Sequence, residues 1–429
     1  MRAGEDIEET RRLQAGAYKD RGHDGRVALV LGAGNVSALV AGDVLHKLFV
    51  ERAVVLLKPN QVNEYLGPIL ADGFRALIER GSLQIVYGGV EEGSYLCHHP
   101  QVDEVHMTGS DRTFNAIVFG PGEEGARNRA ARTPVLNKPI TAELGNISPV
   151  IVVPGPWTEK EIKQQGAKLA SWLTINAGFN CLTPRLIIQQ RQWAQRDALN
   201  HAIREALGAT QTRPAYYPNA EALHARFLEA HPAAWQIGEP SDEALPWTYV
   251  AGVNPDDINH PAFHTEPFCG LMSETTLDVE GTAEFIAEAV RFANEAVWGT
   301  LVAKIVIHPK SLQDPAIAAA IDAAIADLDY GTVSINLFAG LGFALATAPW
   351  GSAPGQEIHD IQSGIGFVNN LLMFENPVKS VVRGPFVQSP DINAPEFSKF
   401  DEFGRKYADF QADPGYGKLA GIVWTVMTG

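Results

Sequence analysis

The chain has 429 residues, 45% of them hydrophobic and 20% charged, with a formal net charge of −16. This length and composition predict a globular protein with two domains, and the acidic balance argues against a nucleic-acid or anionic-membrane partner. Three cysteines are too few for a disulfide framework, the first residues lack an apolar signal core, and no apolar run is long enough to span a bilayer. We therefore expect a cytoplasmic protein.

From Arg26 onward, apolar strands alternate with amphipathic helices. The expected strands are 27–31, 53–57, 83–87, 104–107 and 139–144, and the expected helices are 36–50, 65–80 and 91–98. Strands and helices in this alternation predict a parallel, doubly wound sheet. Residues 120–132, which begin Gly-Pro-Gly, are expected to form a surface loop insertion.

A second α/β stretch follows the first. It is expected to hold a strand at 149–153, a buried strand at 301–307, and helices at 159–174, 193–207, 220–230, 283–296 and 315–326. Residues 340–355 are rich in small residues and are expected to form a loop. Beyond Phe386 the periodicity is weak, so we interpret this stretch as a tail whose structure the sequence does not specify.

Cys181 lies in the stretch 176–185, between the end of a predicted helix and the start of a predicted strand. A thiol at a glycine-containing turn can be exposed enough to react, although a single cysteine is more often a small, inert core residue. Cys269 is a second candidate nucleophile without this setting. Cys97-His98-His99 and His106 do not predict a metal site, because adjacent histidines at a helix end diverge and no second ligand cluster appears.

Two further patterns point to a nucleotide and a carboxylate. Gly32-Ala-Gly34 follows the first strand and opens a helix, a setting that favours the phosphates of a dinucleotide. The second strand ends in Lys58, which could hydrogen-bond a ribose or meet a 2′-phosphate, or could simply be solvated. Glu143 ends the last strand of the first set, at the sheet edge where ligands bind, although an ion-paired glutamate is the commoner case.

Taken together and in this order, these motifs resemble those of the aldehyde dehydrogenase superfamily over residues 26–385. The resemblance implies a Rossmann-like cofactor domain and a second α/β catalytic domain. It implies that Cys181 is the nucleophile, Glu143 the general base, and Asn35 part of the oxyanion hole. The positions that it implies for NAD or NADP binding are Lys58, Gln61, Gly109, Ser110, Glu266 and Phe268.

The resemblance also implies the reaction. An aldehyde would be oxidised to an acid through a cysteine thioester, and water activated by Glu143 would release it. Family members that transfer the acyl group to coenzyme A generally lack this glutamate, so its presence favours hydrolysis. An acyl-CoA-linked enzyme and a catalytically impaired nucleotide-binding member are the alternatives. The sequence does not identify the aldehyde.

Several features depart from the family pattern. The chain begins shortly before the first strand, so we expect the usual N-terminal arm to be missing, and Gln61 replaces a frequent acidic residue, so NADP remains open beside NAD. Val378-Lys-Ser-Val-Val382 resembles the strand that pairs across the family's dimer, which implies a homodimer or larger homo-oligomer. The expected divisions are 1–147 for the cofactor, 148–345 for catalysis, 346–385 as a return segment, and 386–429 as an extension of unknown role.

Overall fold

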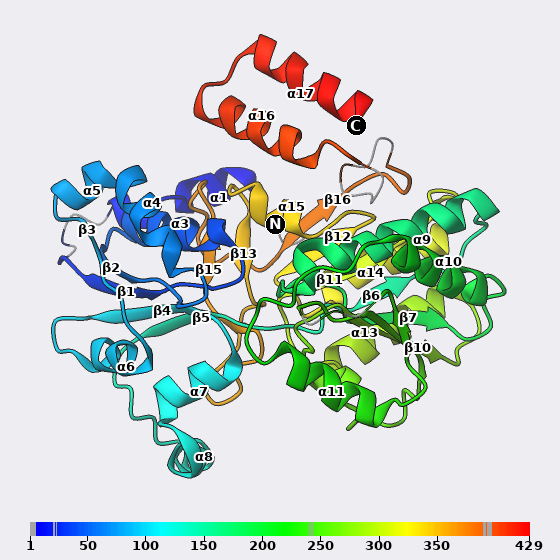
Figure 1. Cartoon of the computed structure of the whole chain (residues 1–429), viewed down its shortest axis with the longest axis horizontal. Helices are drawn as coiled ribbons and strands as arrows, with labels where there is room; N and C mark the ends of the chain where they lie inside the picture. The colour runs from blue at the N-terminus through cyan, green and yellow to red at the C-terminus, as the bar shows by residue number, and fades with distance from the viewer. Residues whose placement is uncertain are drawn as a thin grey trace.

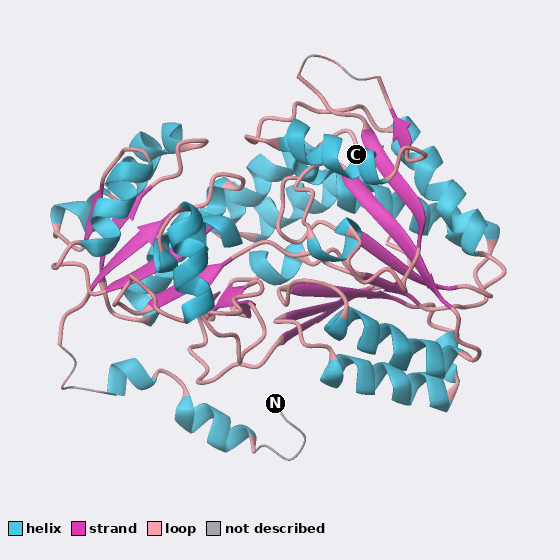
Figure 2. Ribbon diagram, turned by 90° about the horizontal axis from the view of Figure 1, so that it is seen from below, coloured by secondary structure: helices cyan, strands magenta, loops and turns pink. Residues whose placement is uncertain are grey.

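The chain folds around two mostly parallel sheets that lie side by side, each with helices packed on its faces (Figure 1). The computed structural model describes residues 6–19, 22, 24–239, 241, 243–388, 392 and 397–429. This arrangement, also visible from below in Figure 2, confirms the predicted α/β fold class. Because both faces of the central strands are covered, these strands are continuous apolar runs rather than alternating ones.

The first sheet has six strands in the order β14-β5-β4-β1-β2-β3, and all but β14 run parallel. The strands are β1 (Val27–Leu31), β2 (Val54–Lys58), β3 (Leu83–Ile85), β4 (Glu104–Thr108), β5 (Ile140–Glu143) and β14 (Gly364–Ile365). The accompanying helices are α3 (Ser37–Leu45), the π-helical turn η1 (His46–Val50), η2 (Glu64–Leu66), α4 (Gly67–Gly73), α5 (Arg75–Glu79), α6 (Val90–His98), α7 (Asp111–Phe119) and α8 (Gly122–Ala131).

The second sheet has eight strands in the order β16-β12-β11-β6-β7-β10-β9-β8, and only β8 is antiparallel to its neighbour. Its strands are β6 (Val150–Val152), β7 (Leu186–Gln190), β8 (Trp235–Ile237), β9 (Trp247–Val253), β10 (Leu271–Leu277), β11 (Val302–Val306), β12 (Thr332–Ile335) and β16 (Ser380–Arg383). The helices are α9 (Glu159–Thr174), η3 (Ile175–Gly178), α10 (Arg196–Ala209), α11 (Ala220–Ala230), α12 (Pro261–His264), α13 (Thr282–Glu295), η4 (Ser311–Gln313) and α14 (Pro315–Asp327).

The segment after α15 (Gly340–Ala344) returns to both sheets. β13 (Pro349–Gly351) and β15 (Phe367–Asn369) form a small antiparallel pair, while β14 joins the first sheet beside β5. β16 then pairs in parallel with β12 of the same chain. β16 includes most of the segment that we expected to pair across a dimer, and here it pairs within one chain. The oligomeric state stays a prediction.

Local structure differs from the sequence prediction in three places. Residues 120–132 were expected to form a loop, but most of them form α8, whose acidic residues lie in the first turn and whose Arg129 lies in the last, as the helix dipole favours. The single helix expected at 65–80 is interrupted at Phe74, whose φ of −101° and ψ of 17° are not helical. The expected loop at 340–355 contains α15 and β13.

Helices also occupy both ends of the described chain. Near the start are α1 (Ile7–Leu13) and α2 (Gly16–Lys19), and near the end α16 (Phe400–Ala412) and α17 (Tyr416–Thr428) form an antiparallel pair, red in Figure 1. The sequence did not specify the structure of the stretch beyond Phe386; part of that stretch, 389–391 and 393–396, lies outside the described residues. Among the described residues, no helix combines the length and apolar character needed to cross a bilayer.

Candidate active site

A cavity of about 610 Å³ opens between the two sheets, at the carboxyl ends of β1, β4 and β5. Parallel sheets bind ligands at this edge. Seven of the nine residues that we predicted for catalysis or cofactor binding line this one cavity: Asn35, Gly109, Ser110, Glu143, Cys181, Glu266 and Phe268. Residues that come from distant parts of the chain therefore meet at a single site.

The turn that carries Cys181 depends on left-handed backbone. After α9 ends at Thr174, Asn176 and Ala177 have φ values of 54° and 53°, and Gly178 has a φ of 83°. A side chain on Gly178 would also collide with the backbone of Cys269, so glycine is required there for two reasons. The turn ends the helix abruptly and brings Cys181 to the cavity.

Backbone carbonyl groups on both sides of the nucleophile are held by buried side chains. The Ser148 hydroxyl donates to the carbonyl of Cys181 at 3.0 Å, and the ammonium group of Lys304, on β11, donates to the carbonyl of Leu182 at 2.7 Å. Arg185 donates to the carbonyl of Gly178. The sequence analysis missed these residues; a lysine and an arginine inside apolar runs were the available signal.

Cys181 and Glu143 face each other in the cavity. The Cys181 Sγ donates to the Glu143 Oε1 at 3.3 Å, and Glu143 is only 3% exposed. Burial raises the pKa of Glu143 to about 7. Burial, followed by the charges of Glu143 and Glu266, raises the pKa of the Cys181 thiol well above its ordinary value. The resting site therefore holds a neutral thiol beside a carboxyl group that titrates near neutrality and can take its proton.

Asn35 lies on the other side of the nucleophile turn. Its side-chain Nδ2 donates to the carbonyl of Phe179 at 3.0 Å, while its own carbonyl accepts from the Asn176 Nδ2 and the Tyr216 hydroxyl, both at 3.0 Å. An amide nitrogen carries two N–H groups, so the bond to Phe179 leaves one for a substrate oxygen. The first bond orients the side-chain amide and the other two hold the Asn35 backbone, and both Asn35 and Cys181 line the cavity.

Gly109 and Ser110 form the turn after β4. The Gly109 N–H donates to the carbonyl of Glu143 at 3.0 Å, and the Ser110 hydroxyl accepts from the Thr113 N–H at 3.2 Å, which caps α7. The turn thus joins the strand of the carboxylate to the N-terminus of a helix, which favours an anionic group.

Glu266 and Phe268 lie on the opposite wall. Burial raises the pKa of Glu266 to about 8, although the nearby Arg185 acts in the other direction. One carboxylate oxygen, Oε1, is buried and has no hydrogen-bond partner among the described residues. Phe268 has a strained φ of 40° and packs edge-on against Tyr217, with the ring centroids 4.8 Å apart. The backbone thus directs Phe268 into the cavity wall.

Lys58 and Gln61 are not among the residues that line this cavity. Lys58 ends β2, next to β1, and is 8% exposed; burial lowers its pKa, while Glu92 and Glu64 act in the opposite direction. Gln61 is exposed, near Gly89. Their roles toward a cofactor ribose stay predictions.

The other cysteines and His106 lie elsewhere. Cys269 is 1% exposed within the core of the second sheet, and burial raises its pKa to about 12, which makes it a poor nucleophile. Cys97 is fully buried in the core of the first sheet, whereas His106 contacts Thr141 and Asp43. The histidine and cysteine side chains of the sequence cluster thus diverge.

Residues 27–214 match the family model described as "Aldehyde dehydrogenase family". The match covers less than half of the chain and shows that this part is similar to aldehyde dehydrogenases. It is 32% identical over 139 residues to 4-trimethylaminobutyraldehyde dehydrogenase A of Danio rerio, a match that covers 32% of this chain and 24% of that protein. Over 164 residues it is 30% identical to N-succinylglutamate 5-semialdehyde dehydrogenase of Novosphingobium aromaticivorans, covering 38% of this chain and 31% of that protein.

Solved aldehyde dehydrogenase structures share the fold over most of the chain. An NAD-dependent aldehyde dehydrogenase from Sinorhizobium meliloti superposes with a TM-score of 0.61 at 20% identity, covering 83% of this chain and 65% of that one. A succinic semialdehyde dehydrogenase from Streptococcus pyogenes, in complex with NADP+, gives 0.58 at 20% identity, covering 82% and 72%. The matched segments span about a quarter to a third of these two curated relatives' length.

Proposed function

We propose that this protein is an NAD(P)-dependent aldehyde dehydrogenase that releases a free carboxylic acid. The observation that carries the proposal is the 3.3 Å contact between the Cys181 thiol and the Glu143 carboxylate inside the cavity. A thiol beside a base is the arrangement of an activated nucleophile, and a nearby amide, that of Asn35, can serve as an oxyanion donor.

The cavity also fits a nicotinamide dinucleotide. The buried, unpartnered Oε1 of Glu266 needs a hydrogen-bond donor, which the hydroxyl groups of a ribose would supply. Gly109 and Ser110 would approach the phosphates, and Phe268 would pack against the nicotinamide ring. When bound, the cofactor supplies the hydride acceptor. Among similar structures, an indole-3-acetaldehyde dehydrogenase is in complex with NAD+ and the Streptococcus pyogenes enzyme with NADP+, so we propose NAD or NADP here.

The residues of the chain then act in sequence. Glu143 accepts the proton of Cys181, and the thiolate attacks the aldehyde carbon. The resulting oxyanion is held by the Asn35 side-chain amide and the Cys181 N–H, each worth about 3 kcal/mol. Hydride loss leaves a thioester on Cys181, and Glu143 releases to solvent the proton that it took from the thiol. Glu143 then accepts a proton from the attacking water and returns it to the departing Cys181 sulfur, so the acid is released and the thiol is restored. The same carboxylate thus serves both halves of the reaction.

A panel of aldehydes with NAD and with NADP, followed by the absorbance of the reduced cofactor, tests the proposal. We expect turnover that Cys181→Ala abolishes and that the matched control Cys269→Ala retains. Soluble, cofactor-binding protein without turnover on any aldehyde would favour an impaired nucleotide-binding member instead. Adding coenzyme A distinguishes the remaining alternative, because acyl-CoA rather than free acid would identify an acyl-CoA-linked enzyme.

We further propose a cytoplasmic homodimer or larger homo-oligomer. The small number of cysteines, all free in the structure, supports a reducing compartment, and the resemblance of residues 378–382 to a dimer-pairing strand supports assembly. Light scattering of the purified chain measures the mass directly, and a monomer over the micromolar range would contradict the assembly proposal.

A further inference from the structure

A buried carboxylate, Asp43, lies behind the proposed base. It is on α3, the helix that begins just after Asn35, and it is 0% exposed. Its Oδ2 accepts a hydrogen bond from the Thr108 hydroxyl at 3.2 Å, and its Oδ1 lies 3.6 Å from the Nε2 of His106. A fully buried carboxylate without a lysine or arginine partner among the described contacts is costly, which points to a role other than stability.

The register of the sheet places this carboxylate beside Glu143. Thr108 lies opposite Glu143 and His106 lies opposite Thr141 in the parallel pairing of β4 with β5. Side chains two residues apart on a strand share a face, and so do paired residues on neighbouring strands. These four side chains therefore lie on one face of the sheet, and α3 places Asp43 against that face.

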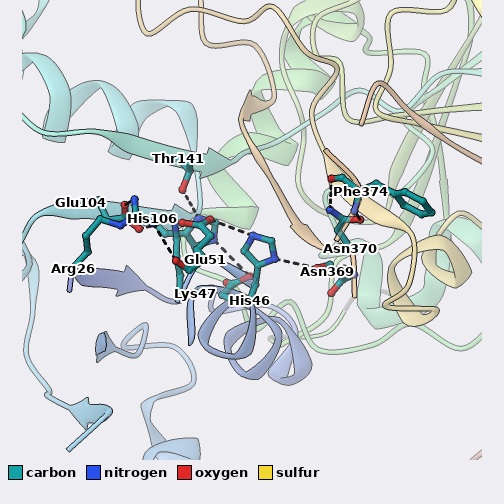
Figure 3. Close-up of polar contacts among 11 residues, drawn as sticks. Arg26, His46, Lys47, Glu51, Glu104, His106, Thr141, Asn369, Asn370 and Phe374 are labelled. Atoms are coloured by element: carbon teal, nitrogen blue, oxygen red, sulfur yellow. Dashed lines mark hydrogen bonds and ion pairs between the residues drawn. The ribbon is translucent and has the colours of Figure 1, made fainter. Parts of the chain in front are cut away.

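His106 is held in place by its second ring nitrogen. Its Nδ1 lies 2.8 Å from the Thr141 hydroxyl (Figure 3). Its Nε2 lies 3.6 Å from the Asp43 Oδ1. Asp43 Oδ1, His106 Nε2 and Glu143 Oε2 are each buried without a hydrogen-bond partner among the described residues. Similar atoms occur elsewhere among the described residues, but here Asp43 Oδ1 and His106 Nε2 lie within ion-pair distance of each other, on the sheet face that carries Glu143.

We propose that Asp43, together with His106, is the positioning residue that sets the protonation of Glu143. This proposal rests on the proposed function of Glu143 as the general base. Two like charges on one buried face oppose each other, so Asp43 keeps Glu143 a strong enough base to take a proton from the Cys181 thiol or from water. His106, when protonated, would offset the charge of Asp43 and weaken that effect.

Electrostatics support this geometry. Burial is the largest cause of the raised pKa of Glu143, and the charge of Asp43 raises it further, while Trp350 and the Cys181 thiol act in the opposite direction. Four other charged side chains lie in this region and neutralise one another as ion pairs: Arg26 with Glu104, and Lys47 with both Glu51 and Glu104. The remaining described groups are His46, which pairs with Glu51, and His106 itself. Asp43 is thus the charge in this cluster that acts on Glu143 and has His106, rather than a lysine or arginine, at ion-pair distance.

The test uses the reactivity of Cys181, which needs no aldehyde turnover. The rate at which iodoacetamide labels Cys181 is measured by mass spectrometry from pH 5 to 9. Proton transfer to Glu143 should govern the acid limb of this profile, which is the fall in labelling rate toward low pH. Glu143→Gln should remove the acid limb, and this loss would identify Glu143 as the group that titrates there. We expect Asp43→Asn, which can still accept from Thr108, to move the limb down by about one pH unit. Where turnover is measurable, the acid limb of kcat should move equally while KM changes little.

A second variant separates the charge effect from a structural one. His106→Gln removes the imidazole that lies 3.6 Å from Asp43, and it should move the limb in the wild-type background but not in the Asp43→Asn background, because His106 acts through Asp43. Glu104→Gln is the matched control: it lies on the same face of β4 but is ion-paired with Lys47 at 3.1 Å and Arg26 at 2.8 Å. It should leave the limb unchanged.

The outcomes distinguish this proposal from the proposed function. Superimposable labelling profiles for wild type and Asp43→Asn would overturn the role of Asp43, whatever the enzyme oxidises. A shifted labelling profile in a protein that turns over no aldehyde would support the Asp43–Glu143 coupling and reject the dehydrogenase proposal.

Discussion

Two carboxylates and one thiol share a buried cavity, and their protonation states decide what the site can do. Glu143, with a pKa of about 7, is poised to exchange protons at neutral pH, whereas the Cys181 thiol does not ionise unaided. Glu266, with a pKa of about 8, is held partly protonated until it finds donors. The site thus depends on proton transfer between its own residues.

Replacing Glu143 by Gln should separate the two halves of the reaction. At pH 9, where hydroxide can help to ionise the thiol, we expect one equivalent of reduced cofactor in a burst, followed by a steady-state rate at least about 100-fold below wild type. Stopped-flow absorbance measures both phases, and Cys181→Ala should show no burst. An unchanged steady-state rate would remove Glu143 from the mechanism.

Glu266 should make the unliganded protein less stable at alkaline pH. Its folded pKa of about 8 lies above the ordinary value of 4.5, so its contribution is fully present below about pH 4.5 and is lost as the pH rises through 8. We therefore expect Glu266→Gln to melt several degrees above wild type at pH 9 and at the same temperature at pH 5. Calorimetry at the two pH values checks this, and a gain of equal size at both would contradict it.

Individual site residues can be predicted from the sequence where their position relative to a helix or strand end is characteristic. Cys181 at a helix-to-strand turn and Glu143 at a strand end were both predicted, and the structure brings them into contact. Asp43 was not predicted, although it interrupts the buried apolar positions Leu39, Val40 and Val44 of its helix. A polar residue at such a position signals a buried partner, but only the pairing of β4 with β5 shows that the partner region includes the active site.

Among the elements, α9 carries the nucleophile turn and packs closely on α10. A side chain on Gly166 would come within 2.6 Å of the Ala202 Cβ and 2.7 Å of its backbone, so glycine lets the two helices approach. We expect Gly166→Ala to lower the free energy of unfolding by about 1–3 kcal/mol, because overpacking forces the helices apart.

Gly208 is the matched control on α10. The nearest atom to an added methyl group there is the Ile237 Cγ2 at 3.8 Å, so Gly208→Ala should be neutral or stabilise by up to about 1 kcal/mol through helix propensity. Urea unfolding of both variants provides the comparison. Equal effects would mean that the close approach at Gly166 does not matter.

Elements with strong periodicity were predicted well. The errors occur where turn-forming residues were given too much or too little weight. The alternating strands and helices from β1 to β5 follow the sequence pattern closely. α8 was missed because Gly120-Pro-Gly122 reads as a loop, whereas the residues after it have the charge order of a helix. The break at Phe74 directly follows Asp72-Gly73, a turn signal that the prediction passed over because the apolar periodicity continues on both sides of it.

In the whole molecule, the return segment reaches the strand of the proposed base. Gly364 has a φ of 127°, and a side chain there would strike the Ala142 carbonyl, so β14 can pair with β5 only through glycine. We expect Gly364→Ala to lower both the melting temperature and the aldehyde turnover, because β5 carries Glu143.

Gly355 provides the control for backbone strain alone. Its φ is 97°, yet an added methyl group would meet nothing within 4 Å. Gly355→Ala should therefore cost only strain, about 1 kcal/mol, and leave turnover unchanged in thermal and kinetic assays. Equal losses in the two variants would show that pairing of β14 with β5 is not what supports the site.

The pairing of β14 with β5 also has a consequence for biosynthesis. About 220 residues separate Glu143 from its antiparallel partner Gly364. At roughly 5–20 residues per second, the outer edge of β5 waits about 10–40 s on the ribosome before its neighbouring strand has been synthesised. An exposed strand edge invites pairing with other chains, so the strand that carries the proposed base is also the strand that most needs protection while the protein is being made.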